Sequence, residues 1–90
     1  MSMTDLRTQI DALDGALIDM LVDRAGYIDR AITLKQNENL PARINDRVED
    51  VVQKVRAKAD ASGFDADLAE TLWRHRIEWS IAREEKVLTP

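Results

Sequence analysis

The fold of this protein is decided by residues 4–37, which read TDLRTQIDALDGALIDMLVDRAGYIDRAITLKQN. Apolar side chains recur in this stretch at spacings of three and four, the period of one face of an α-helix. The stripe consists of Leu6, Ile10, Leu13, Leu17, Leu21 and Ile28. It continues through Gly15 and Gly26, although each glycine costs a helix about 1 kcal/mol relative to alanine. We therefore expect a single helix from about Thr4 to about Asn37.

The length of this helix predicts an oligomer. A helix of this length makes a rod of roughly 50 Å, whereas a compact chain of 90 residues has a radius of gyration of about 12 Å. Two shorter helices cannot cover the whole stripe, so we expect a second copy of the chain to cover the remainder. The alternative is a kink at Gly26 within a monomer, but one glycine is a weak helix breaker.

Two more helices follow a turn at residues 37–41 (NENLP). The spacing of Asp46 and Glu49 fits a capping box, and Gly63 suits a left-handed helix end. The expected bounds are about Asp46 to Gly63 for the second helix, and Asp65 or Asp67 to about Val87 for the third. No strand-like alternation, repeat or linker is evident, so residues 1–90 are expected to form one all-α domain of three helices.

Three charged residues lie inside the apolar stripes. Arg24 and Lys35 fall in the middle of the first stripe, and Glu84 lies at the centre of a second. That second stripe consists of Trp73, Ile77, Ile81 and Leu88. Isolated buried charges are very costly, so these groups need partners or a ligand. The structural alternative is that the two cations extend to solvent, or that Glu84 pairs with one of them. The joint pattern favours a small, polar, anionic ligand.

Composition excludes several classes of function. The chain has no cysteine, which excludes disulfides, thiolate catalysis and thiolate metal sites, and is compatible with the cytoplasmic location that we expect. A formal net charge of −4 argues against a nucleic-acid partner, and no apolar run approaches the length of a membrane span. The carboxylates show no metal-ligand spacing, and there is no glycine-rich phosphate loop. We therefore expect no metal and no cofactor.

The two cations of the first stripe are placed to converge on one ligand. Arg24 and Lys35 are eleven positions apart, which on a helix is about 20° of rotation and roughly 16 Å of rise. Arg7 lies about 80° from Lys35 and far along the rod, so it cannot easily reach the same pocket within one subunit. In an antiparallel dimer, Arg7 would instead close the pocket from across the interface.

Other polar positions belong to the second and third helices. Arg47 follows the loop at the start of the second helix, where it can swing over a pocket mouth. Ser80 and Glu84 are neighbours one turn apart on one face of the third helix. His75 has no acidic or serine partner at a suggestive spacing, so we expect it on the helix surface.

Taken in order, these residues resemble the small all-helical chorismate mutases of type II over nearly the whole chain. The matching positions are Leu6-Arg7-x-x-Ile10-Asp11-x-Leu13-Asp14, Leu17, Leu21, Arg24, Lys35, the Pro41 loop, Asp46-Arg47 and Ile77-x-x-Ser80-x-x-x-Glu84. Each element alone is weakly diagnostic, but their order and spacing together are specific. The resemblance implies one type II domain over residues 1–90, with three helices per subunit in an intertwined homodimer. It also implies two shared active sites, each of which takes an arginine from the partner's long helix.

The resemblance also implies a role for each residue. The implied substrate-binding residues are Arg7 from the partner subunit, Arg24, Arg47 and Ser80, and the implied catalytic residues are Lys35 and Glu84. The family reaction is a unimolecular rearrangement of the dianion chorismate to prephenate, which needs no nucleophile, metal or redox group. Because negative charge grows on the ether oxygen as its bond to carbon breaks, donors directed at that oxygen stabilise the transition state.

Two departures from the family pattern leave alternatives open. Glu84 stands where the family often has glutamine, and a carboxyl group donates a hydrogen bond only when protonated, so we expect activity to be best at acidic pH. Ile44 and Val48 stand where acidic side chains usually contact the ring hydroxyl. This loss, with residues 40–42 (LPA) and 78–82 (EWSIA), is similar to the isochorismate-pyruvate lyase branch, which forms salicylate. A mutase of an aminated chorismate and a non-catalytic helical dimerisation or regulatory module are further alternatives.

Overall fold

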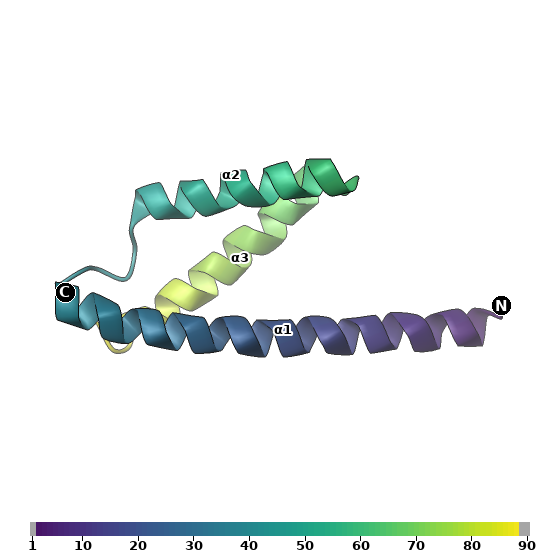
Figure 1. Cartoon of the computed structure of the whole chain (residues 1–90), viewed down its shortest axis with the longest axis horizontal. Helices are drawn as coiled ribbons and strands as arrows, with labels where there is room; N and C mark the ends of the chain where they lie inside the picture. The colour runs from purple at the N-terminus through teal and green to yellow at the C-terminus, as the bar shows by residue number, and fades with distance from the viewer. Residues whose placement is uncertain (1, 89–90) are drawn as a thin grey trace.

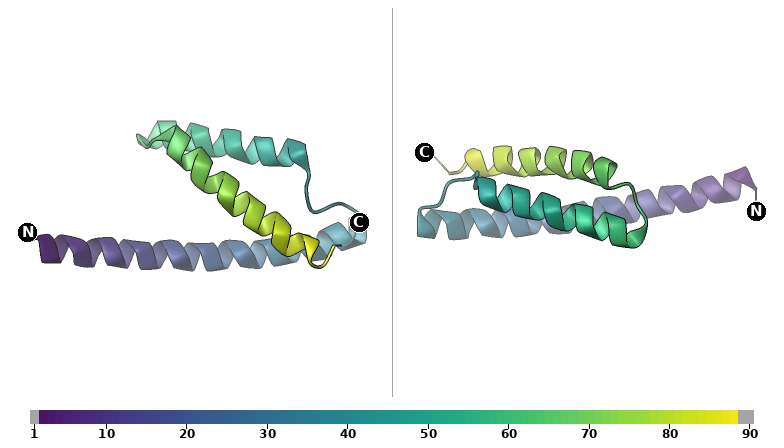
Figure 2. Two further views of the ribbon diagram at one scale, coloured as in Figure 1. Left: turned by 180° about the vertical axis from the view of Figure 1, so that it is seen from behind. Right: turned by 90° about the horizontal axis from the view of Figure 1, so that it is seen from above.

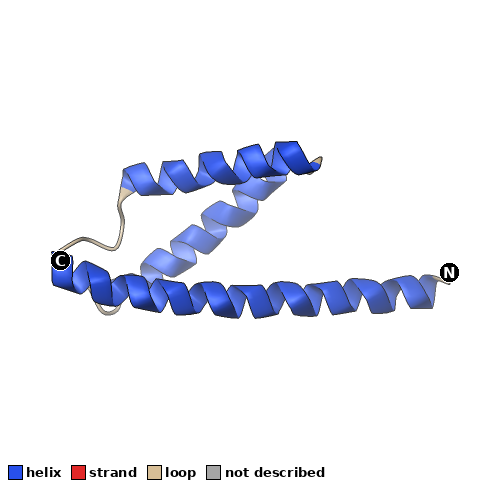
Figure 3. Cartoon of the chain, in the orientation of Figure 1, coloured by secondary structure: helices blue, strands red, loops and turns tan. Residues whose placement is uncertain are grey.

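The computed structural model describes residues 2–88, which form three α-helices and no strand. They are α1 (Met3–Glu38), α2 (Asn45–Ser62) and α3 (Ala66–Glu85), joined by short loops (Figures 1 and 3). The all-α prediction is therefore confirmed, and the expected helix bounds are correct to within two residues.

The first helix is continuous, as predicted. At its start Ser2 and Asp5 form a capping box, in which each side chain accepts a hydrogen bond from the backbone N–H of the other residue, at 3.1 and 3.2 Å. Neither Gly15 nor Gly26 interrupts it. It ends at Asn39, whose left-handed backbone (φ 56°) lets its N–H bond to a carbonyl of the last turn.

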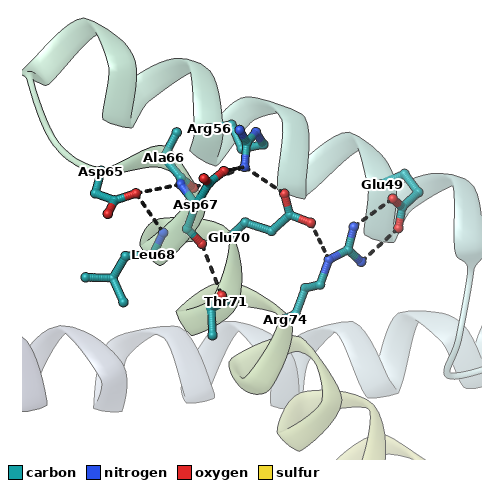
Figure 4. Close-up of polar contacts among 9 residues, drawn as sticks. All are labelled: Glu49, Arg56, Asp65, Ala66, Asp67, Leu68, Glu70, Thr71 and Arg74. Carbon is teal, nitrogen blue, oxygen red and sulfur yellow. Dashed lines mark hydrogen bonds and ion pairs between the residues drawn. The ribbon is translucent and has the colours of Figure 1, made fainter.

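The ends of the shorter helices are partly as expected. Gly63 ends α2 in the left-handed conformation (φ 75°), and the Asp65 carboxylate caps α3 by accepting two backbone N–H groups (Figure 4). The predicted capping box of Asp46 with Glu49 is wrong. Ile44 is the N-cap of α2, and its apolar side chain cannot form a capping hydrogen bond. The Glu49 carboxylate accepts hydrogen bonds from Arg74 of α3 instead of a backbone N–H.

Buried apolar side chains connect the loop after α1 to the α2–α3 pair. The core cluster consists of Ala42, Val52, Ile77 and Ile81, with Val48, Val51 and Leu88 packed against it. Val52 is completely buried at its centre. Because Ala42 belongs to this core, the loop between α1 and α2 is held close to α3, and its backbone is available to the site described below.

Ion pairs fix α2 against α3. The Arg74 guanidinium reaches Glu49 at 2.9 Å and Glu70 at 2.7 Å, and Arg56 reaches Glu70 at 2.9 Å and Asp67 at 3.0 Å (Figure 4). Arg74 lowers the pKa of both Glu49 and Glu70, because its hydrogen bonds favour their charged forms. The pair of Arg74 with Glu70 lies one turn apart within α3. The contacts of Arg74 with Glu49 and of Arg56 with Glu70 and Asp67 join α2 to α3, so a pattern along one helix does not predict them.

Two further ion pairs tie α3 to the rest of the chain. Arg83 binds Asp29 of α1 through two hydrogen bonds of 2.8 and 3.0 Å, and Arg43 of the loop binds Glu78 through two of 2.9 and 2.6 Å. Planar bidentate pairs of this kind fix orientation as well as distance. The Arg83–Asp29 pair holds the C-terminal end of α3 against the C-terminal half of α1, where the left view of Figure 2 shows the two helices meeting.

The N-terminal part of α1 extends beyond the other two helices (Figures 1 and 2). The molecule measures 54 × 24 × 15 Å, and its radius of gyration of 16.3 Å exceeds the compact value of about 12 Å. Leu6, Ile10, Leu13, Leu17 and Leu21 keep 40% to 63% of their surface exposed. In α1 only Ile32 is buried. The homodimer that would cover this stripe stays a prediction. No helix within residues 2–88 is both long and apolar enough to cross a bilayer.

Candidate active site

A cavity of about 240 Å³ lies where the three helices and the loop meet. Its lining comes from α1 (Arg24, Ile28, Ala31, Lys35), the loop (Ala42, Ile44), α2 (Arg47, Val48, Val51) and α3 (Ile77, Ser80, Ile81, Glu84). We call it the main cavity. It gathers five of the six site residues that the sequence predicts, and all of them except Arg7 contribute to its wall.

Lys35 and Glu84 form a buried ion pair in this wall. The ammonium Nζ of Lys35 lies 2.9 Å from Glu84 Oε1, and the side chains retain only 18% and 5% of their surface. The alignment is poor for a hydrogen bond, and Glu84 Oε1 has no hydrogen-bond donor among the described residues. Lys35 instead donates to the backbone carbonyl of Ala42 at 2.8 Å. The structural alternative raised above, that Glu84 pairs with one of the cations, is therefore correct, yet both groups still face the main cavity.

Arg24 is held by a neutral partner. Its Nη1 donates to the Ser80 hydroxyl at 3.2 Å, and no carboxylate within residues 2–88 forms an ion pair with it. Burial, and then the nearby charge of Arg47, lower the pKa of Arg24. An arginine remains protonated despite such a shift. Arg24 is thus an oriented cation whose charge is available to an anionic ligand.

Arg47 lies at the mouth of the main cavity, as expected, but it is not free. Its guanidinium pairs with Asp50 of the same helix at 2.6 Å, and 63% of its side-chain surface is exposed. Contact with a ligand therefore requires the side chain to exchange Asp50 for the ligand. An exposed pair of this kind is weak, so the exchange costs little.

Arg7 lies outside the main cavity of its own subunit. It precedes Arg24 by seventeen residues, which on a straight helix is about 25 Å. The expectation that it cannot reach this pocket within one chain agrees with that placement. Its arrival from a partner stays a prediction.

Apolar side chains replace the acidic contacts that the family pattern leads one to expect. Ile44 and Val48 both line the main cavity, as their positions in the sequence predict. Glu49 does not substitute for them, because its two oxygens bind Arg74 at 2.9 and 3.1 Å on the α2–α3 interface (Figure 4). Glu84 is consequently the one carboxylate among the described residues that line this cavity.

Two contacts that position the site residues were not predicted from the sequence. The Ala42 carbonyl positions the Lys35 ammonium, and the Arg43–Glu78 pair fastens the loop that carries this carbonyl. Backbone groups leave no signature in side-chain spacing, and the pairing partner of Arg43 depends on how the loop crosses α3. No cluster of three or more metal-ligating side chains occurs within residues 2–88.

The fold and this site define an all-helical protein with a cationic cavity, in which three cations, one carboxylate and the Ser80 hydroxyl face an otherwise apolar wall. The chain belongs to the chorismate mutase type II family, whose sequence pattern matches residues 6–85.

The chain is also similar to two curated T-proteins. The chain is 31% identical over 85 residues to the T-protein of Haemophilus influenzae and 32% identical over 82 residues to the T-protein of Enterobacter agglomerans. These matches cover 94% and 91% of this chain but only 22% of each relative, so the chain spans about a fifth of their length. No solved structure matches the chain.

Proposed function

We propose that the protein is a chorismate mutase, which rearranges chorismate to prephenate. The observation that carries the proposal is the placement of Arg24 with Ser80, and of Lys35 with Glu84, around one small cavity. Membership of the family supports it. A dianionic substrate matches the excess of cations over carboxylates in the wall.

Binding selects the reactive shape of the substrate. Chorismate reacts only when its enolpyruvyl group folds over the ring, and cations that hold both carboxylates at fixed positions favour this compact form. Arg24 supplies one such contact, oriented by Ser80. Arg47 supplies another when it leaves Asp50, and Arg7 of the partner subunit completes the set. Most of the wall is apolar, and a less polar surrounding strengthens these charge contacts.

The chemical step depends on the ether oxygen. As its bond to carbon breaks, this oxygen gains negative charge, and hydrogen-bond donors that face it stabilise the transition state more than the substrate. The Lys35 ammonium is one donor, kept in place by the Ala42 carbonyl. Glu84 is the second, and it donates only when it carries a proton. The same proton removes the ion pair with Lys35, which frees the ammonium for the substrate.

The enzyme is proposed to act as a homodimer with shared sites. The exposed stripe of α1 is the support for this, since Leu6 to Leu21 would otherwise leave an apolar face in water. In an antiparallel two-fold pair, the N-terminal part of one α1 lies beside the later part of the other, which brings Arg7 to the partner's main cavity.

A second candidate function is the pericyclic cleavage of isochorismate to salicylate and pyruvate. The observation that favours it is the apolar wall at Ile44 and Val48, which offers no acceptor to the ring hydroxyl of chorismate. The same cations serve either substrate. Incubation of the purified protein with each compound, followed by product analysis, distinguishes the two. Prephenate from chorismate supports the mutase, salicylate from isochorismate supports the lyase, and turnover of neither by a folded protein refutes both.

A further inference from the structure

A second cavity of about 240 Å³ adjoins the main cavity. Arg24 and Ser80 line both, and the remaining wall comes from Leu21 and Ala25 of α1 and from Arg76 and Trp79 of α3. We call it the side cavity. An occupant of the side cavity would therefore lie beside Arg24, as would the proposed substrate in the main cavity.

Arg76 brings an uncompensated charge to the side cavity. Its guanidinium carbon lies 4.3 Å from the centre of the Trp73 ring, and no carboxylate within residues 2–88 pairs with it. The other arginines of α3, Arg74 and Arg83, both have carboxylate partners. Burial, and then the charge of Arg24, lower the pKa of Arg76. Two half-buried cations that share one cavity call for an anion between them.

The exposed part of α1 carries a carboxylate at the matching position. Asp14 follows Arg7 by seven residues, which is about 20° of rotation and about 10.5 Å of rise, so both lie on one side of the helix. Along α1, Arg24 lines both cavities, Ile28 lines the main cavity and Leu21 lines the side cavity, and Ile28 and Leu21 are separated by the same seven positions. An antiparallel partner that places its Arg7 against Ile28 therefore places its Asp14 against Leu21, beside Arg76.

We infer that Asp14 of the partner subunit enters the side cavity and forms an ion pair with Arg76, once in each half of the dimer. This inference rests on the two-fold dimer of the proposed function. The contact fixes the register of the two long helices. In this register, the partner's Arg7 lies at the main cavity. Asp14 and Arg76 are thus positioning residues for the shared site.

Charge reversal with mixing tests the pair. In Arg76→Glu both contacts of the homodimer become repulsive between carboxylates, and in Asp14→Arg both become repulsive between cations. An equimolar mixture of the two variants forms a heterodimer in which both contacts are attractive again. We expect each variant alone to raise the dimer Kd at least about tenfold. This rise corresponds to a loss of about 0.7 kcal/mol of binding free energy at each of the two contacts. The mixture is expected to return to the unsubstituted value, and the KM for chorismate is expected to follow the same pattern.

Control variants make the same charge changes on the opposite face of α1. Arg30→Glu and Asp19→Arg lie about 140° and 160° from the centre of the apolar stripe, and they are expected to leave the dimer Kd unchanged, alone and mixed. If Arg76→Glu lowers the helical circular dichroism, Arg76→Ala and Asp14→Ala form a double-mutant cycle, in which non-additive effects on the dimer Kd are expected and additive effects contradict the pair.

Several results would overturn the inference. The first is that the unsubstituted protein is a monomer. The second is that Arg76→Glu and Asp14→Arg have the same dimer Kd as the control variants. The third is that the mixture of the two variants has a dimer Kd as high as that of each variant alone. A rise in KM at Arg76→Glu with an unchanged dimer Kd would also overturn it, and would assign the side cavity to a carboxylate of the small-molecule ligand. The proposed function fails separately, because chorismate turnover by the unsubstituted protein tests it whether or not this contact exists.

Discussion

Replacement of Lys35 by alanine separates the structural role of the buried ion pair from its chemical role. The Lys35 ammonium lies 2.9 Å from Glu84 Oε1 and 2.8 Å from the Ala42 carbonyl, and Glu84 is only 3% exposed. Lys35→Ala removes one of the two proposed donors to the ether oxygen, so kcat/KM is expected to fall by about 10²- to 10³-fold, the cost of one oxyanion-hole donor.

The same substitution leaves a buried carboxylate without its cation. Removing one partner of a buried pair costs about 3–5 kcal/mol, and we expect the lower end because the Lys35 side chain keeps 18% of its surface in contact with solvent. The double variant Lys35→Ala with Glu84→Gln removes the stranded charge. It is expected to regain most of the free energy of unfolding while its activity stays low, because the ammonium is still missing.

Urea unfolding followed by circular dichroism measures the loss of stability, and initial rates of chorismate loss measure the fall in kcat/KM. Lys54→Ala is the matched control, because Lys54 pairs with Asp50 on the surface with 69% of its side chain exposed, and it should change neither quantity appreciably. Retention of activity within tenfold by a folded Lys35→Ala protein would refute the catalytic role. Equal instability of the single and double variants would refute the stranded-charge explanation.

Three further predictions concern the site and the helix contacts. Glu84→Gln supplies a donor that needs no proton, so the pH optimum of kcat is expected to move toward neutral, and an unchanged pH–rate profile would contradict the proposed donor role. Gly63→Ala forces a side chain into a left-handed position (φ 75°) with no atom within 4 Å of the new Cβ, so it should destabilise by about 1 kcal/mol from backbone strain alone, which thermal unfolding measures. The folded-state pKa values of Glu49 and Glu70 are lowered by Arg74, so their contribution to stability is present above the unfolded carboxyl pKa of about 4.3 and is lost as pH falls through the lower folded values. Arg74→Gln should therefore weaken the fall in urea midpoint between neutral pH and about pH 3.5, whereas an identical fall in both proteins would exclude this pair as its cause.

The sequence predicts the helices well because their signals are local. The left-handed glycine at Gly63 and the cap at Asp65 each act within one turn of the chain. The capping box predicted at the start of α2 is the exception. The spacing of Asp46 and Glu49 fits a cap, but the Glu49 carboxylate gains more from two hydrogen bonds to Arg74 on another helix than from a backbone N–H.

The sequence predicts the site less completely than the helices, because several contacts in the site join residues that are far apart in the chain. Arg24, Lys35 and Glu84 stand out because a charge within an apolar stripe is anomalous wherever the helices pack. The contacts that orient them, the Ser80 hydroxyl and the Ala42 carbonyl, depend on the crossing of α3 and on the path of the loop. The sequence does not predict a role for Arg76, because that role depends on its proximity in the fold to the charge of Arg24, which is fifty-two positions away in the sequence.

The most direct test of the central claim is to incubate the purified protein with chorismate and to follow the reaction mixture by nuclear magnetic resonance. The cationic cavity and the proposed donors to the ether oxygen predict that prephenate accumulates as chorismate disappears, without an added metal or cofactor. Chorismate that persists beside a folded, dimeric protein would contradict the account.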